Sequence, residues 1–172
     1  EEMNPREQKK WLQYELKPVK DRILVFVEGN HEGRTTKDVD QRVVEDIADY
    51  LDKGNLYRED EAYIKLTFGK RQGSGSQMCY TIYVTHGSGG GKRPGSAMNN
   101  IELVALGTEA DIYIMGHVHK KMAYKNAVRR PDLRNNNIIE QERLFVISSH
   151  WSDFGGYAAR KMLNPSAKGS VP

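Results

Sequence analysis

The sequence lacks the features that mark secreted and membrane proteins. Its one cysteine, Cys79, cannot form an internal disulfide and is typical of a reducing cytoplasm. No stretch approaches the roughly 18 consecutive apolar residues of a membrane span. The opening residues have neither the basic start nor the apolar run of a signal peptide. These absences predict a cytoplasmic protein with no membrane partner.

The chain also has little excess charge of either sign. It contains 172 residues, of which 28% are charged, and its formal net charge is +3. This mildly basic balance favours anionic substrates such as phosphates, but it is far from the dense basic stripe of a dedicated nucleic-acid-binding protein. With 38% hydrophobic residues the chain can bury one ordinary core, so we predict a single domain over 1–172.

The first third of the chain predicts a helix, a strand and a second helix. Residues 5–16 have a helical pattern, and residues 22–27, which are apolar from Ile23 onward, are typical of a strand buried on both faces. Apolar residues then recur every four positions between 39 and 51. Thr35 and Asp38 resemble a capping box at the start of this second helix.

The remainder predicts one more helix within a cluster of strands. The predicted elements are strands at 62–67 and 79–85 that pair as a hairpin, a helix at 98–107, and strands at 111–115, 121–125 and 143–149. A polar loop is expected from 129 to 137. Strands that alternate with helices before a cluster of strands favour a layered α/β sandwich over a bundle or a barrel.

Four of the five histidines fall in short blocks, each of which follows an apolar run. The blocks are Gly29-Asn30-His31-Glu32, Thr85-His86-Gly87 and Gly116-His117-Val118-His119. Open α/β sheets place their sites where strands end, and imidazole is the commonest metal ligand. In an extended segment alternate side chains point the same way, so His117 and His119 are expected to face one site.

Each block alone has an ordinary structural interpretation. Asn30 fits a turn, and His86 fits a hydrogen-bonded histidine at a strand end. His150, followed by Trp151, could stack on a base or line a pocket, but we adopt a packing role for it. Only the combination of three histidine-bearing strand ends points to a functional site.

In this order the blocks resemble those of the calcineurin-like metallophosphoesterase family. The family pattern contains a Gly-Asn-His-Asp/Glu block, a later His followed by Gly, and a closing Gly-His-x-His, and the resemblance runs from about Asp21 to Phe154. It implies a layered α-β-β-α sandwich. It also implies hydrolysis of a phosphoester substrate by two divalent metal ions with a bridging hydroxide nucleophile.

The resemblance also implies a role for each residue of the blocks. Asn30, His86 and His117 would bind one metal ion, and His119 would bind the other. His31 would lie near the scissile phosphate and help the leaving oxygen depart, a task that imidazole can perform near neutral pH. Imidazole nitrogens with an amide oxygen suit manganese, iron or zinc better than magnesium or calcium.

Several cations next to the blocks are candidates for substrate binding. Arg34 follows the first block, and Lys92 and Arg93 lie in the glycine-rich segment after His86. Arginine and lysine side chains commonly bind phosphate oxygens. The competing interpretation is that these are ordinary solvated surface charges.

Part of the family pattern is missing. An Asp-x-His and a Gly-Asp-x-x-Asp/Asn should precede the first block, but the chain has no Asp-x-His and none of its 16 glycines is followed by aspartate. The resemblance therefore predicts a sandwich that is incomplete at the N-terminus and inactive by itself. A missing N-terminal segment or a second chain would complete it, or the fold has lost catalysis.

Two other functions remain open. One is a non-catalytic binding module that keeps the fold and uses the sheet edge as its surface. The other is a nuclease of the DNA-repair type, with a nucleotide or nucleic acid as substrate, which the modest positive charge and the Gly-Lys-Arg segment permit. A steep salt dependence of DNA affinity would favour the nuclease.

Overall fold

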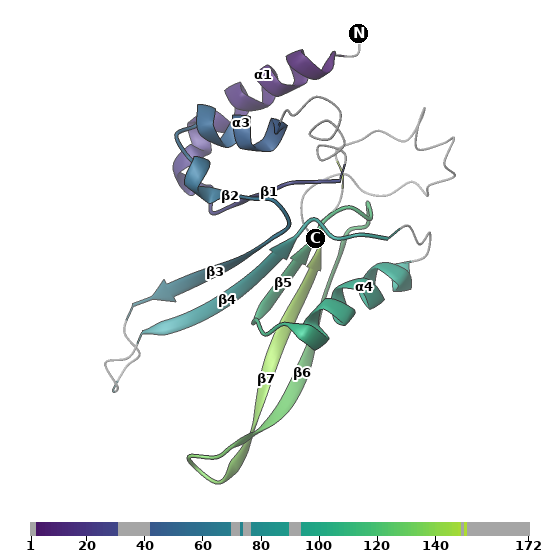
Figure 1. The fold of residues 1–172 in the computed structure, drawn as a ribbon. Helices are drawn as coiled ribbons and strands as arrows, with labels where there is room; N and C mark the ends of the chain where they lie inside the picture. The colour runs from purple at the N-terminus through teal and green to yellow at the C-terminus, as the bar shows by residue number, and fades with distance from the viewer. Residues whose placement is uncertain are drawn as a thin grey trace. The chain divides into compact units, whose positions relative to one another are not determined.

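The computed structural model confirms a mixed α/β fold (Figure 1). It describes residues 3–30, 42–69, 73, 77–89, 94–148 and 150. The chain divides into two compact units, residues 1–62 and 63–172. Within the described segments no helix combines the length and the apolar character needed to cross a membrane.

The first unit holds helices and a small sheet. Its elements are α1 (Pro5–Leu16), η1 (Lys17–Arg22), β1 (Phe26–Val27), α3 (Val43–Tyr50), η2 (Gly54–Leu56) and β2 (Tyr57–Arg58). Helix α1 matches the prediction, and a capping box fixes its start. The Asn4 side chain accepts a hydrogen bond from the Glu7 amide, and the Glu7 carboxylate accepts one from the Asn4 amide, each over 3.0 Å.

The predicted strand at 22–27 is wrong over most of its length. Only Phe26 and Val27 form a strand, and Leu24 is 52% exposed. β1 pairs in parallel with β2, which is itself only two residues long, so no described partner extends the ladder. The second helix is present as α3, while Thr35 and Asp38 lie outside the described residues.

The second unit contains a five-stranded mixed sheet. Its elements are β3 (Glu61–Phe68), β4 (Met78–Thr85), α4 (Pro94–Gly107), β5 (Ile112–Met115), β6 (Met122–Asp132) and β7 (Asn137–Ile147), and the strand order is β3-β4-β5-β7-β6. β4, β5 and β7 are parallel, and β6 is antiparallel to β7. β3 and β4 are neighbours that run in opposite directions, as predicted for a hairpin (Figure 1).

The predicted polar loop from 129 to 137 is mostly strand. β6 runs to Asp132 and β7 starts at Asn137, so only residues 133–136 form the turn. Two of the four pairs in this region are polar, Arg129 opposite Glu140 and Asp132 opposite Asn137. Opposite charges across a strand pair stabilise it without apolar alternation. A search for alternating apolar residues therefore misses this extension.

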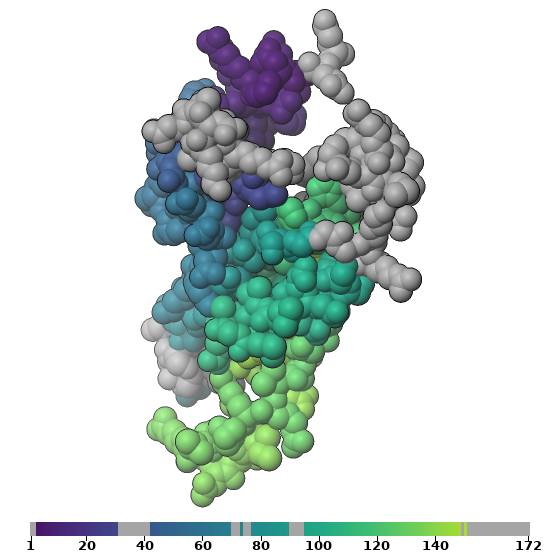
Figure 2. All heavy atoms as spheres, turned by 45° about the vertical axis from the view of Figure 1, so that its right-hand side comes forward, coloured from purple at the N-terminus to yellow at the C-terminus, as the bar shows by residue number. Residues whose placement is uncertain are grey.

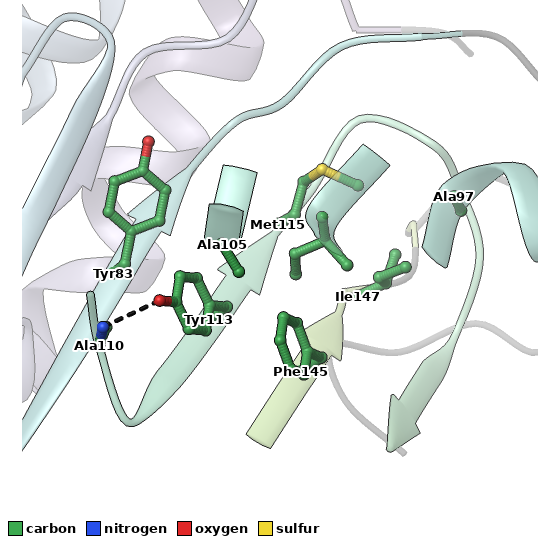
Figure 3. Close-up of a cluster of buried hydrophobic side chains, with 9 residues drawn as sticks. Tyr83, Ala97, Ala105, Ala110, Tyr113, Met115, Phe145 and Ile147 are labelled. Carbon is green, nitrogen blue, oxygen red and sulfur yellow. Dashed lines mark hydrogen bonds between the residues drawn. The ribbon is translucent and has the colours of Figure 1, made fainter. Parts of the chain in front are cut away.

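One face of the sheet packs against α4 around stacked aromatic rings (Figure 3). Tyr113 and Phe145, on neighbouring strands, are each at most 1% exposed, and their rings stack with centroids 5.0 Å apart. The Tyr113 hydroxyl accepts a hydrogen bond from the Ala110 amide and donates one to the Thr108 carbonyl, each over 2.9 Å. The helix contributes alanine and isoleucine side chains at four-residue spacing: Ala97, Ile101 and Ala105.

Asp111 ties three strands together just before β5 begins. Its carboxylate accepts hydrogen bonds from the amide and hydroxyl of Thr81 on β4, over 2.8 and 2.9 Å, and from the Gln141 amide on β7, over 2.6 Å. Burial alone would raise the pKa of Asp111. The hydrogen bonds from Thr81 and Gln141 and the charge of Arg130 outweigh burial and lower it below its ordinary value.

Asp111→Asn should remove a pH-dependent part of the stability. A carboxyl whose pKa is lowered by folding stabilises the fold above its unfolded pKa of about 4, and this contribution disappears as the pH falls through the lower folded value. We expect the variant to unfold about 1–3 kcal/mol more easily at pH 7, with the difference narrowing below about pH 4. Urea unfolding from pH 7 to pH 3 measures this.

Asp132→Asn is the matched control. Asn135 and the turn backbone lower the pKa of Asp132, but these contacts stay within one turn rather than joining strands. The control should show the smaller difference at pH 7. If the loss of unfolding free energy caused by Asp111→Asn is the same at every pH, the proposed role of the Asp111 carboxylate is contradicted.

Candidate functional site

Three parallel strands end at the same edge of the five-stranded sheet. The register pairs Thr85 of β4 with Met115 of β5, and Met115 with Ile147 of β7. Backbone hydrogen bonds continue past the strands, from the Gly116 amide to the Thr85 carbonyl over 3.4 Å and from the Ser148 amide to the Met115 carbonyl over 2.8 Å. The residues that follow these strands therefore lie next to one another.

His86 and His117 meet at this edge. The His86 Nε2 and His117 Nδ1 atoms are 3.1 Å apart, and the rings meet edge to face with centroids 5.1 Å apart. Two imidazole nitrogens bound to one ion at about 2.0–2.1 Å would be separated by about 2.9–3.4 Å in octahedral or tetrahedral geometry. The separation is that of a hydrogen bond between the two rings, and it also lies in the range expected for a shared ion.

His119 lies against a histidine for which the sequence favours only a packing role. The rings of His119 and His150 stack with centroids 5.1 Å apart and an interplanar angle of 25°. His150 follows β7 just as His86 follows β4 and His117 follows β5. That shared position after a buried strand is the signal that could have identified it.

The backbone of the Gly-His-Val-His block is not extended, so the argument that its two histidines point the same way is wrong. His117 has φ 64° and His119 has φ 52°, both in the left-handed region. The Val118 amide donates to the Gly116 carbonyl over 2.7 Å, which closes a tight turn. Each histidine consequently has a different neighbour, His86 for His117 and His150 for His119.

Of the other predicted site residues, the structure describes only Asn30. Asn30 lies exposed in the first unit, three residues after β1 ends. Its assignment as a ligand stays a prediction. His31, Arg34, Lys92 and Arg93 lie outside the described residues.

A buried carboxylate that the sequence did not single out precedes Asn30. Glu28 is 7% exposed, and its carboxylate accepts a hydrogen bond from the Tyr57 hydroxyl. Arg42 donates to the same hydroxyl over 3.3 Å and forms an ion pair with Glu59 over 3.1 Å. Burial raises the pKa of Tyr57, and the Glu28 carboxylate raises it further. The network anchors the chain immediately before the first histidine block.

Within the described part of the chain, no group of three or more histidine, cysteine, aspartate or glutamate side chains is arranged to hold a metal ion. The histidines of the sheet edge form two pairs instead. No family model, curated protein or solved structure matches this chain.

Gly87→Ala tests the close packing behind the histidine pair. Gly87 has φ 79°, and a Cβ there would lie 2.4 Å from Cγ of Met115, a core residue. We expect the variant to lose about 1–3 kcal/mol of stability in urea unfolding, from overpacking and backbone strain.

Gly95→Ala provides the control, because it adds the same methyl group in α4 with no atom within 4 Å. It should gain up to about 1 kcal/mol from helix propensity. Equal effects of the two alanines would contradict the packing argument.

Proposed function

We propose that this chain is part of a metal-dependent phosphoesterase, a hydrolase whose site lies at the carboxyl ends of the parallel strands. The observation that carries the proposal is the 3.1 Å approach of His86 Nε2 to His117 Nδ1. His119 and His150 stack in the loops that follow β5 and β7. Several imidazoles at one sheet edge are a donor set for manganese, iron or zinc.

The residues of the histidine blocks have distinct tasks in this proposal. His86 and His117, with Asn30, hold one divalent ion, and His119 holds a second. Such ions, when bound, polarise phosphoryl oxygens and lower the pKa of water. His31 protonates the departing oxygen. The phosphoester substrate is bound by Arg34, Lys92 and Arg93. Nucleotides and nucleic acids are among the candidate phosphoester substrates.

The proposed site needs carboxylates that this chain does not supply in the family's positions. We propose that an N-terminal segment or a second chain provides the Asp-x-His and Gly-Asp motifs and completes an α-β-β-α sandwich. The described layers that support this are the five-stranded sheet and the helix α4 on one of its faces. The exposed single thiol of Cys79 supports a place in the cytoplasm.

His117→Ala and His31→Ala should separate metal binding from catalysis. Zn²⁺ and Mn²⁺ affinities are measured by calorimetry on the full chain, and hydrolysis of bis-p-nitrophenyl phosphate is measured with the N-terminal motifs supplied. His117→Ala should weaken metal binding at least about tenfold. His31→Ala should keep its metal affinity and lose about 10²–10⁴-fold in turnover.

Equal loss of metal in both variants would contradict the assigned roles. Absence of any metal-dependent turnover after the motifs are supplied would contradict the proposed enzymatic function and favour the non-catalytic binding module. A DNA affinity that falls steeply with salt, together with turnover of DNA, would identify the nuclease among the phosphoesterases.

A further inference from the structure

A second site candidate lies on the α4 side of the sheet, away from the histidines. A cavity of about 510 Å³ opens between α4 and the strands β6 and β7. In Figure 2 the surface is hollowed where the teal spheres of α4 meet the green spheres of the hairpin. Arg143 in its lining lies four residues before the end of β7, about 13 Å along the strand. The cavity is therefore separate from the histidine edge.

The floor of the cavity departs from the apolar pattern of its face. Tyr124 pairs with Phe145 across β6 and β7, and the rings stack with centroids 4.9 Å apart. One step further along the same face, the opposed residues are Asn126 and Arg143. The apolar core therefore ends at a polar pair. Helix α4 still covers this pair, because the Arg143 guanidinium donates a hydrogen bond to the Ala105 carbonyl of α4 over 3.4 Å.

Two polar atoms on this floor, Asn126 Oδ1 and Arg143 Nε, are buried without a hydrogen-bond partner among the described residues. The Tyr124 hydroxyl interacts with the Glu102 carboxylate instead, and Tyr124 does not line the cavity. Buried polar atoms in folded proteins nearly always have partners, and the exceptions call for a bound water, ion or ligand. Two such atoms on one cross-strand pair, a donor on Arg143 and an acceptor on Asn126, indicate a common missing partner.

The walls of the cavity are apolar and accessible. Leu103 and Leu106 of α4 are 64% and 83% exposed, and Val128 and Phe145 line the sheet side. The volume lies within the usual range for small-molecule sites, which combine apolar walls with a few convergent polar groups. A ligand with an apolar body and a compact polar head matches this division.

The charges of the cavity select the head group. Arg143 contributes a cation and Glu102 an anion to the lining, so a charged head meets one like charge in either case. The two unpartnered atoms are a donor, at Arg143, and an acceptor, at Asn126. A neutral head with both N–H and C=O satisfies all of these groups.

We propose that this cavity binds a neutral, amide-bearing small molecule whose apolar body packs against Leu103, Leu106 and Phe145. The head accepts a hydrogen bond from Arg143 and donates one to Asn126. Lactams and the amide edges of heterocyclic bases belong to the same class, because each carries an adjacent donor and acceptor.

An NMR titration of the full chain with three probes of one body tests this proposal. The probes are 4-phenylbutyramide, 4-phenylbutyrate and 4-phenylbutylamine, which share a phenylalkyl body and carry a neutral amide, an anionic and a cationic head. We expect saturable shift changes at cavity residues with the amide, including the Arg143 Nε–H resonance, and affinities at least about fivefold weaker for the two ions.

Variants of the polar floor distinguish specific recognition of the amide head from nonspecific hydrophobic binding. Arg143→Met and Asn126→Leu should weaken binding of 4-phenylbutyramide at least about fivefold. Arg129→Met is the matched control, because Arg129 is exposed on the same strand pair and does not line the cavity. It should bind the amide as the original chain does.

Three outcomes would overturn the proposal. Tighter binding of 4-phenylbutyrate would make the cavity an anion site. Shifts that do not saturate with any probe would make it a solvent-filled groove. If Arg129→Met weakens binding of 4-phenylbutyramide as much as the floor variants do, the polar floor has no specific role in recognition. If Arg143→Met does not fold, the Arg143 Nε–H shift in the original chain decides between these outcomes.

Discussion

The alignment of β4, β5 and β7 depends on the carboxylate of Asp111. It bonds to Thr81 on one side and Gln141 on the other, and the backbone of the same residue bonds to Thr81 and Leu144. In a sheet, a slip of one residue exchanges the two faces of a strand. Any such slip here would expose Tyr113 and move the strand ends out of line. Contacts at the start of β5 therefore help to set the meeting of His86 with His117 beyond its other end.

Elements whose cause is local could be predicted from the sequence. Helix α1 carries its own capping box at Asn4 and Glu7, and the alternation in β3 and β4 marks a hairpin. Elements whose extent depends on a distant partner could not. The apolar run at 22–27 has a strand partner of only two residues, and the polar ends of β6 and β7 become strand because they face each other.

The candidate site follows the same division. The histidine blocks could be predicted because a polar residue after a buried strand lies at a sheet edge whatever the rest of the fold does. A role for His150 could not be predicted, because one histidine carries no pattern and its contact with His119 needs the parallel pairing of β5 and β7. The cavity was invisible because Asn126 and Arg143 stand out only once they are placed opposite each other under α4.

The left-handed backbone at His117 and His119 has a consequence for how this chain can change. Such a conformation costs a residue with a Cβ about 1–2 kcal/mol, and glycine escapes that cost. Selection for stability alone would thus favour glycine over histidine at these two positions. The loop therefore carries two imidazoles at a cost in stability that glycine would avoid.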